Sequence, residues 1–418
     1  MLKENRTFRM LFFSYGLSTL GDWFDFIAVS ILLGFVWKVD PMTMALLPIA
    51  YAAPGILLSQ FAGVLADRVN KVRMIMSMNT LQAILTLLLL AMPNPFWFLV
   101  VVALRSAASV FNDPAQQTLT RQIVPEHQLL KASAMNGAVL QLGKLIGPLL
   151  GGLVAAVFAP ALCLVINASC FLLSNGFLFA IRKVENHLPR PSAEEQPLPY
   201  RQAWQEGWRI FLQSRVLLFS TIFVIVTSMA IQLADAQFPV IFREKLPEHP
   251  EMLGYTISVV GLGALATVTW LHRLQEIRSY GWVLGGGVLL IGIGFSWIGV
   301  FQPDDGMYWL LVPASLTGVG TGLTSVGGNY LIQKESPPHA LGRVRGIMQS
   351  LTSATFIIAP LLGGVIMTLL GPSTAFLWVG LLIVVIGGGA ILLQRWIWGK
   401  RTKDVAVATA TVGSERVG

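Results

Sequence analysis

Long apolar stretches recur along the whole chain, and short polar segments separate them. An α-helix needs about 20 consecutive apolar residues to cross the hydrocarbon core of a bilayer, and most of these stretches have that length. The pattern therefore predicts twelve membrane-spanning helices. Their approximate ranges are 10–37, 42–65, 73–92, 96–117, 133–158, 160–181, 216–241, 253–271, 281–301, 307–333, 343–370 and 374–397.

One polar segment interrupts the series after the sixth span. Residues 183–199 contain four prolines and several charges, so they cannot cross the bilayer and are typical of a linker. Residues 200–213 place tryptophans among charged side chains, which suits an amphipathic helix at the inner membrane surface. The predicted organisation is a six-helix half at 1–182, the linker with its amphipathic helix at 183–213, a second six-helix half at 214–398 and a disordered cytoplasmic tail at 399–418.

The two halves share a sequence repeat. Ile146-Gly-Pro-Leu-Leu-Gly-Gly152 returns 212 positions later as Ile358-Ala-Pro-Leu-Leu-Gly-Gly364. Arg9-Met-Leu-Phe-Phe-Ser14 returns 206 positions later as Arg215-Val-Leu-Leu-Phe-Ser220. A repeat of this kind indicates that both halves follow one structural plan.

Composition and charge narrow the class of protein. Only 12% of the residues are charged, whereas a soluble domain carries about 25%. The net charge of +8 does not indicate nucleic-acid binding, because nearly all Lys and Arg lie in the N-terminus, the even-to-odd loops, the linker and the tail. By the positive-inside rule this places both termini in the cytoplasm. The exceptions are Lys38, Arg243 and Lys245 on proposed outside loops, with Arg105 and Lys144 inside spans.

Twelve spans in two halves with a parallel repeat resemble the major facilitator superfamily. That resemblance implies an all-α membrane fold of two six-helix halves, with the substrate held between them near mid-depth. The loop after the second span, Gly63-Val-Leu-Ala-Asp-Arg-Val-Asn-Lys-Val-Arg73, is similar to the superfamily signature Gly-x-x-x-Asp-Arg-x-Gly-Arg-Arg. Asn70 stands where the signature has its second glycine, and asparagine tolerates a left-handed backbone.

In the superfamily this loop latches the two halves together on the cytoplasmic side. The resemblance therefore implies a cytoplasmic gate, with Asp113 of the fourth span as the expected partner of Arg68 or Lys71. The alternative is an ordinary basic loop that follows the positive-inside rule. The expected gate residues are Gly63, Asp67, Arg68, Lys71, Arg73 and Asp113.

The fifth span resembles the motif found in drug:proton antiporters of the superfamily, which favours export. Glycines four residues apart let helices approach closely, and a proline inside the span bends it. The alternative is an ordinary close-packed helix pair, and span eleven shares part of the motif through the repeat. The motif residues are Gly143, Gly147, Pro148, Gly151 and Gly152.

Ionisable side chains deep in a membrane are costly and indicate function by default. Asp22 and Asp25 share a face of the first span, and Arg105 and Lys144 lie at a similar depth on spans four and five. They suggest a charge network in which one aspartate carries a proton, and Arg105 matches a span-four arginine that the superfamily associates with proton transfer. A purely structural cluster of ion pairs remains the alternative.

The second half contains one deep acid, Asp235, with no basic residue evident at its depth. It is a candidate proton carrier, or else an acid near the outer mouth in contact with water. Small polar residues on span ten suit a cavity wall, although glycine-rich packing explains them nearly as well. The expected cavity residues are Trp23, Phe26, Thr317, Thr321 and Asn329.

The sequence shows no nucleotide-binding signature, metal-ligand cluster or nucleophile–base arrangement. We therefore expect no enzyme activity, no metal and no cofactor, and transport driven by an ion gradient. Within the superfamily the chain resembles the bacterial exporters that include the enterobactin and macrolide efflux proteins. The residues that carry this resemblance are Leu20-Gly21-Asp22-Trp23, Asn112-Asp-Pro-Ala115, Val124-Pro125-Glu126 and Gly342-Arg343-Val344.

The expected function is proton-coupled export of hydrophobic small molecules, drugs or antibiotics among them, by a monomer in a bacterial inner membrane. Protons, the bilayer and the small-molecule substrate are the expected partners, and nucleic acid is not. A lysophospholipid flippase is the first alternative, because Arg105 and Lys144 could meet a headgroup phosphate. Siderophore export would change only the cargo. The span-five motif argues against nutrient uptake, and the buried charges argue against a non-transporting scaffold.

Overall fold

The computed structural model describes residues 5–125, 128–182, 215–271, 279–335 and 341–397. Twelve segments within these ranges are long and apolar enough to cross a membrane, which confirms the predicted number of spans. The first half contains α1 (Arg6–Ile31), α2 (Pro41–Arg68), α3 (Lys71–Leu89), α4 (Pro95–Ser109), α5 (Asn112–Ile123), α6 (Leu129–Val157) and α7 (Pro160–Ile181). The proposed linker and tail lie outside the described residues, so their limits remain predictions.

The second half contains α9 (Arg215–Asp235), α10 (Phe238–Lys245), α11 (Glu251–Leu271), α12 (Gly286–Val300), α13 (Leu311–Glu335), α14 (Leu341–Leu370), α15 (Pro372–Leu392) and α16 (Gln394–Ile397). Short π-helical segments extend two of the spans, η1 (Leu32–Val36) after α1 and η4 (Gly281–Gly285) before α12. Two short 3₁₀ helices, η5 (Pro303–Asp305) and η6 (Met307–Leu310), join α12 to α13.

Two spans that the sequence predicts as continuous helices are broken. Span four divides into α4 and α5, and span seven divides into α9 and α10. A proline has no N–H for the carbonyl four residues earlier, and its ring collides with that carbonyl. Pro114 stands four residues after Val110, which directly follows the last residue of α4. Pro239 stands four residues after Asp235, which is the last residue of α9. The breaks therefore follow from the positions of these two prolines.

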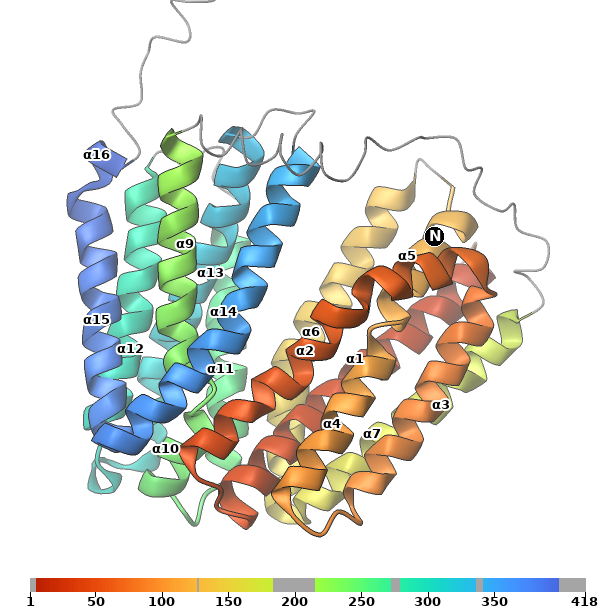
Figure 1. Ribbon diagram of the computed structural model, residues 1–418, viewed down its shortest axis with the longest axis horizontal. Helices are drawn as coiled ribbons and strands as arrows, with labels where there is room; N and C mark the ends of the chain where they lie inside the picture. Colours follow the sequence, from red (N-terminus) through yellow and green to blue (C-terminus); the bar gives the residue numbers. More distant parts are fainter. Residues whose placement is uncertain (1–4, 126–127, 183–214, 272–278, 336–340, 398–418) are drawn as a thin grey trace, which may run out of the picture.

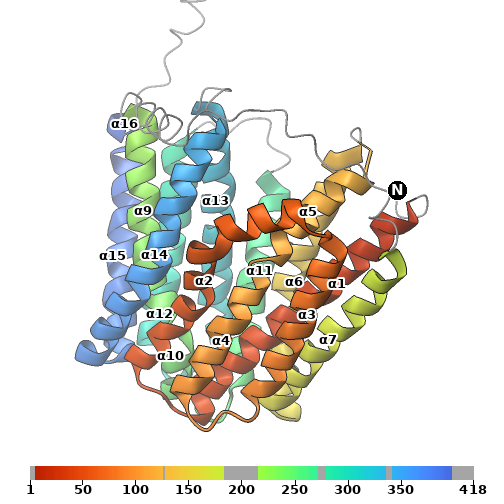
Figure 2. The same ribbon diagram turned by 45° about the vertical axis from the view of Figure 1, so that its right-hand side comes forward.

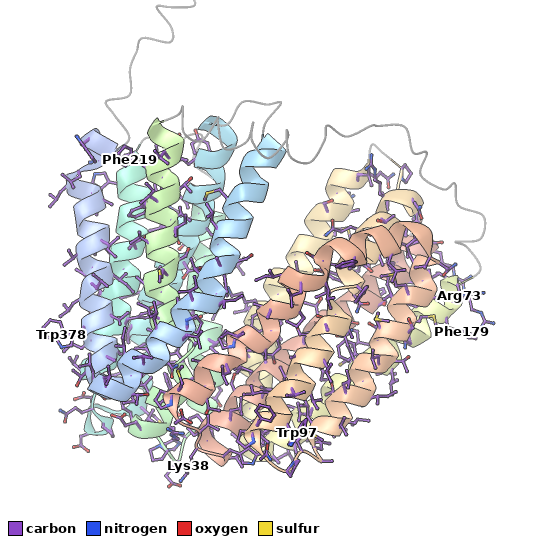
Figure 3. The ribbon with its side chains drawn as sticks, in the orientation of Figure 1. Lys38, Arg73, Trp97, Phe179, Phe219 and Trp378 are labelled. Carbon is purple, nitrogen blue, oxygen red and sulfur yellow. The ribbon has the colours of Figure 1, made fainter. Side chains whose placement is uncertain are left out.

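The helices form two bundles, α1–α7 and α9–α16, that lie side by side (Figure 1). The ribbons converge at the end of the molecule where α10 lies and diverge at the opposite end, in both views (Figures 1 and 2). We call the converging end the loop end, because it carries the connections at 37–40, 90–94, 246–250 and 301–306. We call the opposite end, at which α1 and α9 begin, the linker end. Lys38 and Trp97 mark the loop end, and Arg73 lies toward the linker end (Figure 3).

The glycine pairs of spans five and eleven show the repeat in three dimensions. Gly151 of α6 packs against Ile27 of α1, and Gly363, 212 positions later, packs against Leu233 of α9. Leu233 stands 206 positions after Ile27, which is the offset of the first-span repeat. The adjacent glycine in each pair faces the other half. Each duplicated span therefore contacts its own half on one face and the opposite half on another.

The tightest contacts between the halves among the described residues lie near the loop end, and α11 also meets the middle of α6 where Gly261 faces Leu145. A Cβ at position 152 would lie 3.0 Å from the Cα of Gly254 in α11, and a Cβ at position 364 would lie 3.1 Å from the carbonyl oxygen of Pro41 in α2. Such short approaches between helices are possible only without side chains. They bring α6 against α11 and α2 against α14.

Polar side chains close the loop end further. Arg243 of α10 donates to the carbonyl oxygens of Gly34 and Val39 in the other half, at 3.0 and 2.9 Å. Gln237 donates to the carbonyl oxygen of Pro41 at 2.9 Å. From the sequence we expected Arg243 on an outside loop and gave it no role. In the structure its side chain forms hydrogen bonds that join the two halves.

The first half is also bonded internally across four helices. Ser174 of α7 lies 2.7 Å from the hydroxyl oxygen of Ser14 in α1 and accepts from Asn79 of α3 at 3.2 Å. Asn112 at the start of α5 donates to Asn79 at 3.0 Å. Within a membrane such polar groups must be satisfied by protein partners. These bonds hold α1, α3, α5 and α7 in one body.

We predict that Gly152→Ala lowers the apparent melting temperature of the purified protein. The new Cβ would meet backbone atoms of α11, which cannot rotate away, and such overpacking costs roughly 1–3 kcal/mol. The matched control is Gly176→Ala on α7, where nothing lies within 4 Å of the new Cβ and the helix propensity improves. Equal melting temperatures for both variants would contradict the close contact between α6 and α11.

Candidate functional site

A buried ion pair lies at the centre of the first half. Nη2 of Arg105 in α4 lies 2.5 Å from Oδ2 of Asp25 in α1, and the two side chains are only 5% and 0% exposed. The hydroxyl of Tyr51 in α2 donates to the same carboxylate oxygen at 2.9 Å. Three helices thus bring one acid, one base and one phenol together, as a buried charge in a membrane requires.

The ion pair leaves hydrogen-bonding capacity unused. Oδ1 of Asp25 and both Nε and Nη1 of Arg105 are buried and have no hydrogen-bond partner within the described residues. The Arg105 guanidinium also lies 5.8 Å from the centre of the Tyr51 ring. An arginine with two unused donors is poised to bind a further acceptor, such as a water molecule or a second carboxylate.

Asp22 lies one helical turn before Asp25 but in a different environment. Its side chain is exposed, whereas that of Asp25 is buried. The charges of Arg105, Asp25 and Asp113 all act on the Asp22 carboxylate. Asp113, in the first turn of α5, is exposed as well. The first half therefore presents two accessible carboxylates beside one that is buried with a base.

The charge of Lys144 on α6 reaches an acid of the other half, the Asp235 carboxylate. The sequence suggested that Lys144 joined the first-half network and that Asp235 had no base near it. Both expectations remain predictions, although the charge of Lys144 does act on Asp235. Asp235 is exposed at the C-terminal end of α9, where Pro239 stops the helix.

The predicted antiporter motif forms two grooves on α6. Gly143, Gly147 and Gly151 face α1, and a Cβ at position 143 would lie 3.2 Å from the Trp23 ring. Pro148 and Gly152 face α11, where the Pro148 carbonyl oxygen approaches Gly254. Motif residues four positions apart thus share a face, as helix geometry requires.

The predicted cavity residues are dispersed. Trp23 packs into the α6 groove, and Phe26 lies between Trp23 and Tyr51, with ring centres 5.8 and 6.2 Å apart. Thr317 is buried and donates to the carbonyl oxygen of Pro313 at 2.9 Å. Thr321 lines a pocket in the second half. The side chain of Asn329 lies outside the described residues.

The predicted gate loop is short and well capped. Asn70 is the N-cap of α3 and accepts from the backbone N–H of Arg73 at 2.8 Å. Its φ of −68° is extended rather than left-handed, so the expectation based on left-handed tolerance was wrong, and capping explains the asparagine instead. Lys71 is buried and Arg73 is exposed. The side chains of Gly63, Asp67 and Arg68 lie outside the described residues, so the gate remains a prediction.

Sequence reasoning missed Tyr51 and Gln237. Tyr51 was one tyrosine within an apolar span, and no spacing rule connects it to Asp25, which lies 26 residues earlier. Gln237 is fully buried and leaves its Oε1 atom without a partner within the described residues. A glutamine four residues before the end of a predicted span was a detectable signal, because amides are costly in hydrocarbon.

Comparison with known proteins agrees with this architecture. The family model described as the Major Facilitator Superfamily matches residues 11–344 and 248–413. The uncharacterized MFS-type transporter YfiS of Bacillus subtilis (strain 168) is 28% identical over 394 residues, covering 93% of each chain. The multidrug efflux pump Tap of Mycolicibacterium fortuitum is 24% identical and covers 71% of this chain and 72% of its own. The macrolide efflux protein A of Streptococcus pyogenes is 23% identical, with coverages of 82% and 84%.

Solved structures show the same fold. The bacterial homolog of the human lysosomal transporter Spinster has a TM-score of 0.71 at 11% identity, covering 95% of this chain and 98% of its own. A POT family transporter in complex with 5-aminolevulinic acid has a TM-score of 0.69 at 16% identity, with coverages of 94% and 97%. The expected resemblance to the superfamily and its drug-efflux group is thus confirmed. The chain belongs to the Major Facilitator Superfamily, and it is a multi-pass membrane transporter, not an enzyme.

Proposed function

We propose that the protein exports hydrophobic or amphipathic small molecules, drugs or antibiotics among them, in exchange for protons. The observation that carries this proposal is the buried Asp25–Arg105 pair with the exposed Asp22 beside it. A structural ion pair alone does not need a second, accessible acid one turn away. The similarity to multidrug and macrolide efflux proteins supports the direction of transport and the class of cargo.

The arrangement of the halves supports alternating access. The tightest described contacts between them gather near the loop end, where α6 meets α11 and α2 meets α14. The bonds from Arg243 and Gln237 add to these contacts. We propose that the glycine contacts act as the fulcrum, and that the polar bonds break when the loop end opens. Rigid rocking of two halves around a central site is the general mode of transporters with such repeats.

The distribution of positive charge supports an orientation. In the sequence, the described segments that join helices at the loop end carry Lys38, Arg243 and Lys245, and the other lysines and arginines outside the spans fall in the remaining segments. We infer from the positive-inside rule that the linker end faces the cytoplasm of a bacterial inner membrane. The ribbons diverge at this end (Figure 1), and we propose that cargo enters here from the cytoplasm or the inner leaflet.

The roles of the two aspartates follow from their surroundings. Asp25 is fully buried and held by Arg105 and Tyr51, so water does not reach its carboxylate. Asp22 is exposed and has no ion pair within the described residues, so it can exchange a proton with water. We propose that Asp22 carries the proton. We also propose that Arg105, whose Nε and Nη1 atoms are unused donors, responds to the charge of the Asp22 carboxylate.

The lipid-flippase alternative requires free bases for a phosphate. The side chain of Arg105 is buried and already binds Asp25, and the charge of Lys144 acts on Asp235. These acids compete with a headgroup for both bases, which favours the exporter. A siderophore would remain a compatible cargo, because the proposed proton site does not depend on what is exported.

The first test follows proton release from inverted membrane vesicles that respiration has acidified. Adding amphipathic cations, macrolides, tetracyclines and lysolipids in turn should release protons for at least one drug-like compound when the wild-type protein is present. Asp22→Asn should abolish this release, because the amide cannot carry a proton. The matched control is Asp304→Asn, an exposed aspartate at the loop end. Full exchange by Asp22→Asn would overturn the assignment of the proton carrier.

A second prediction concerns Arg105→Met. Removing one partner of a buried pair leaves the other charge unpaired and costs about 3–5 kcal/mol, so the apparent melting temperature should fall strongly. The double variant Arg105→Met with Asp25→Leu should recover much of the loss, while proton exchange stays impaired. Thermal unfolding of the purified proteins in detergent measures both effects. If the double variant were no more stable than the single one, the pairing would not be the main contribution of Arg105.

A third prediction concerns Lys144→Phe, which copies the residue found 212 positions later at Phe356. The substitution removes a positive charge that acts on Asp235, so transport should fall. The double variant Lys144→Phe with Asp235→Leu removes both charges and should transport better than the single variant. The vesicle assay provides the measurement. Equal transport by the wild type and the single variant would make the Lys144 charge dispensable.

A further inference from the structure

The turn between η1 and α2 contains a residue in a strained backbone conformation. Among the residues that the structure describes, Lys38 is the one non-glycine residue with a positive φ, at 49°. An L-amino acid in this left-handed conformation brings its Cβ close to the following carbonyl oxygen, which costs free energy. The side chain of Lys38 is exposed and lies at the loop end (Figure 3). The conformation is therefore imposed on the backbone of the turn by its surroundings.

The turn brings two carbonyl oxygens to one nitrogen atom of the other half. Nη1 of Arg243 donates to the carbonyl oxygen of Gly34, before the turn, at 3.0 Å and to that of Val39, after it, at 2.9 Å. The carbonyl groups in the last turn of a helix need partners from outside it, and a positive charge there is favourable. Arg243 thus caps the first helix of the opposite half and holds both sides of the strained turn.

The short helix α10, which carries Arg243, is fastened to the second half. Phe238 of α10 packs against Phe295 of α12 and Phe376 of α15, with ring centres 5.5 Å apart in both pairs. The two residues that follow Arg243 bond to the start of α15 and to the end of α12. We therefore expect α10 to move with the second half. The bonds of Arg243 to the turn are then among those that break when the halves separate at the loop end.

We propose that Arg243 and the Lys38 turn form a loaded lock at the loop end. While the lock is closed, the two hydrogen bonds hold Lys38 in its unfavourable conformation. When Arg243 withdraws with α10, the turn relaxes, and the free energy released favours opening. The strain thus offsets part of the strength of the lock and keeps the closed and open states close in free energy, so that binding events can shift their populations. Arg243 is a positioning residue, because it acts through the turn.

This proposal rests on the proposed function, in which the two halves rock. Its test measures the distance across the loop end of the full chain in lipid nanodiscs, with no cargo and no proton gradient. Spin labels at Phe96→Cys in the first half and Asp304→Cys in the second half report this distance by pulsed electron paramagnetic resonance. Both positions are exposed, whereas the native Cys163 and Cys170 are buried. The wild-type sequence with these labels should give a short, closed distance and a longer, open one.

Removing the strain should favour the closed state. Lys38→Gly should lower the ratio of open to closed molecules about 10-fold, because glycine adopts the left-handed conformation without the steric cost. The matched control is Lys38→Ala, which removes the same charge but keeps a Cβ and therefore the strain. Its ratio should stay at the value of the wild type.

Removing the lock should have the opposite effect. Arg243→Met should raise the ratio of open to closed molecules about 10-fold, because two hydrogen bonds from a charged group outweigh the cost of one left-handed residue. Arg243→Lys keeps a charged donor and should retain part of the closed population. Adding Lys38→Gly to Arg243→Met should change nothing further, because the turn is already relaxed. Such non-additivity is expected of two residues that act through one contact.

Three outcomes would overturn the proposal: equal ratios for Lys38→Gly and Lys38→Ala, a wild-type ratio for Arg243→Met, or a glycine effect that persists undiminished without Arg243. A single, unchanging distance in all of these proteins would overturn it together with the rocking of the halves. The comparison of the two Lys38 variants alters one exposed side chain, so it does not depend on how Arg243→Met folds. Because no gradient or cargo is present, failure of proton exchange in vesicles would leave the result for the lock intact.

Discussion

The hydrocarbon core of a membrane contains no water, so each charge within it must have a partner in the protein or reach an aqueous space. The first half meets this requirement with Arg105, which binds Asp25, while Tyr51 adds a hydrogen bond to the same carboxylate. Three helices are thereby fixed relative to one another. Asp22, one turn away and exposed, has the second option, contact with water. This difference underlies the roles that we propose for the two acids.

The two halves follow one plan but differ in chemistry. Both fifth-position helices use a glycine pair, one member packed on the first helix of its own half and the other on the second helix of the opposite half. The duplication therefore builds both fulcrum contacts from one motif. At the repeat positions of the two aspartates, however, the second half has Ser228 and Ile231. The glycine contacts that we propose as the fulcrum are thus repeated in both halves, whereas the two carboxylates at these positions are found in the first half alone.

The fold was largely predictable, because the bilayer constrains the sequence strongly. The number of spans and the repeat followed from apolar length and from the glycine-proline motif. The breaks in spans four and seven were also present in the sequence as Pro114 and Pro239, but proline inside a span is often tolerated, as Pro148 and Pro360 are within α6 and α14. Whether a proline bends a helix or ends it depends on neighbouring partners for the freed carbonyl groups.

The sequence by itself determined which residues are costly in a membrane: Asp22, Asp25, Arg105, Lys144 and Asp235 were identifiable from composition and depth alone. Only the tertiary structure decided their partners. Asp25 lies with Arg105 and Tyr51, whereas the charge of Lys144 acts on Asp235 in the other half. The physical reason is that depth along a helix follows from counting residues, at about 1.5 Å each. The direction in which a side chain points, and the helix it meets, depend on the packing of all twelve spans.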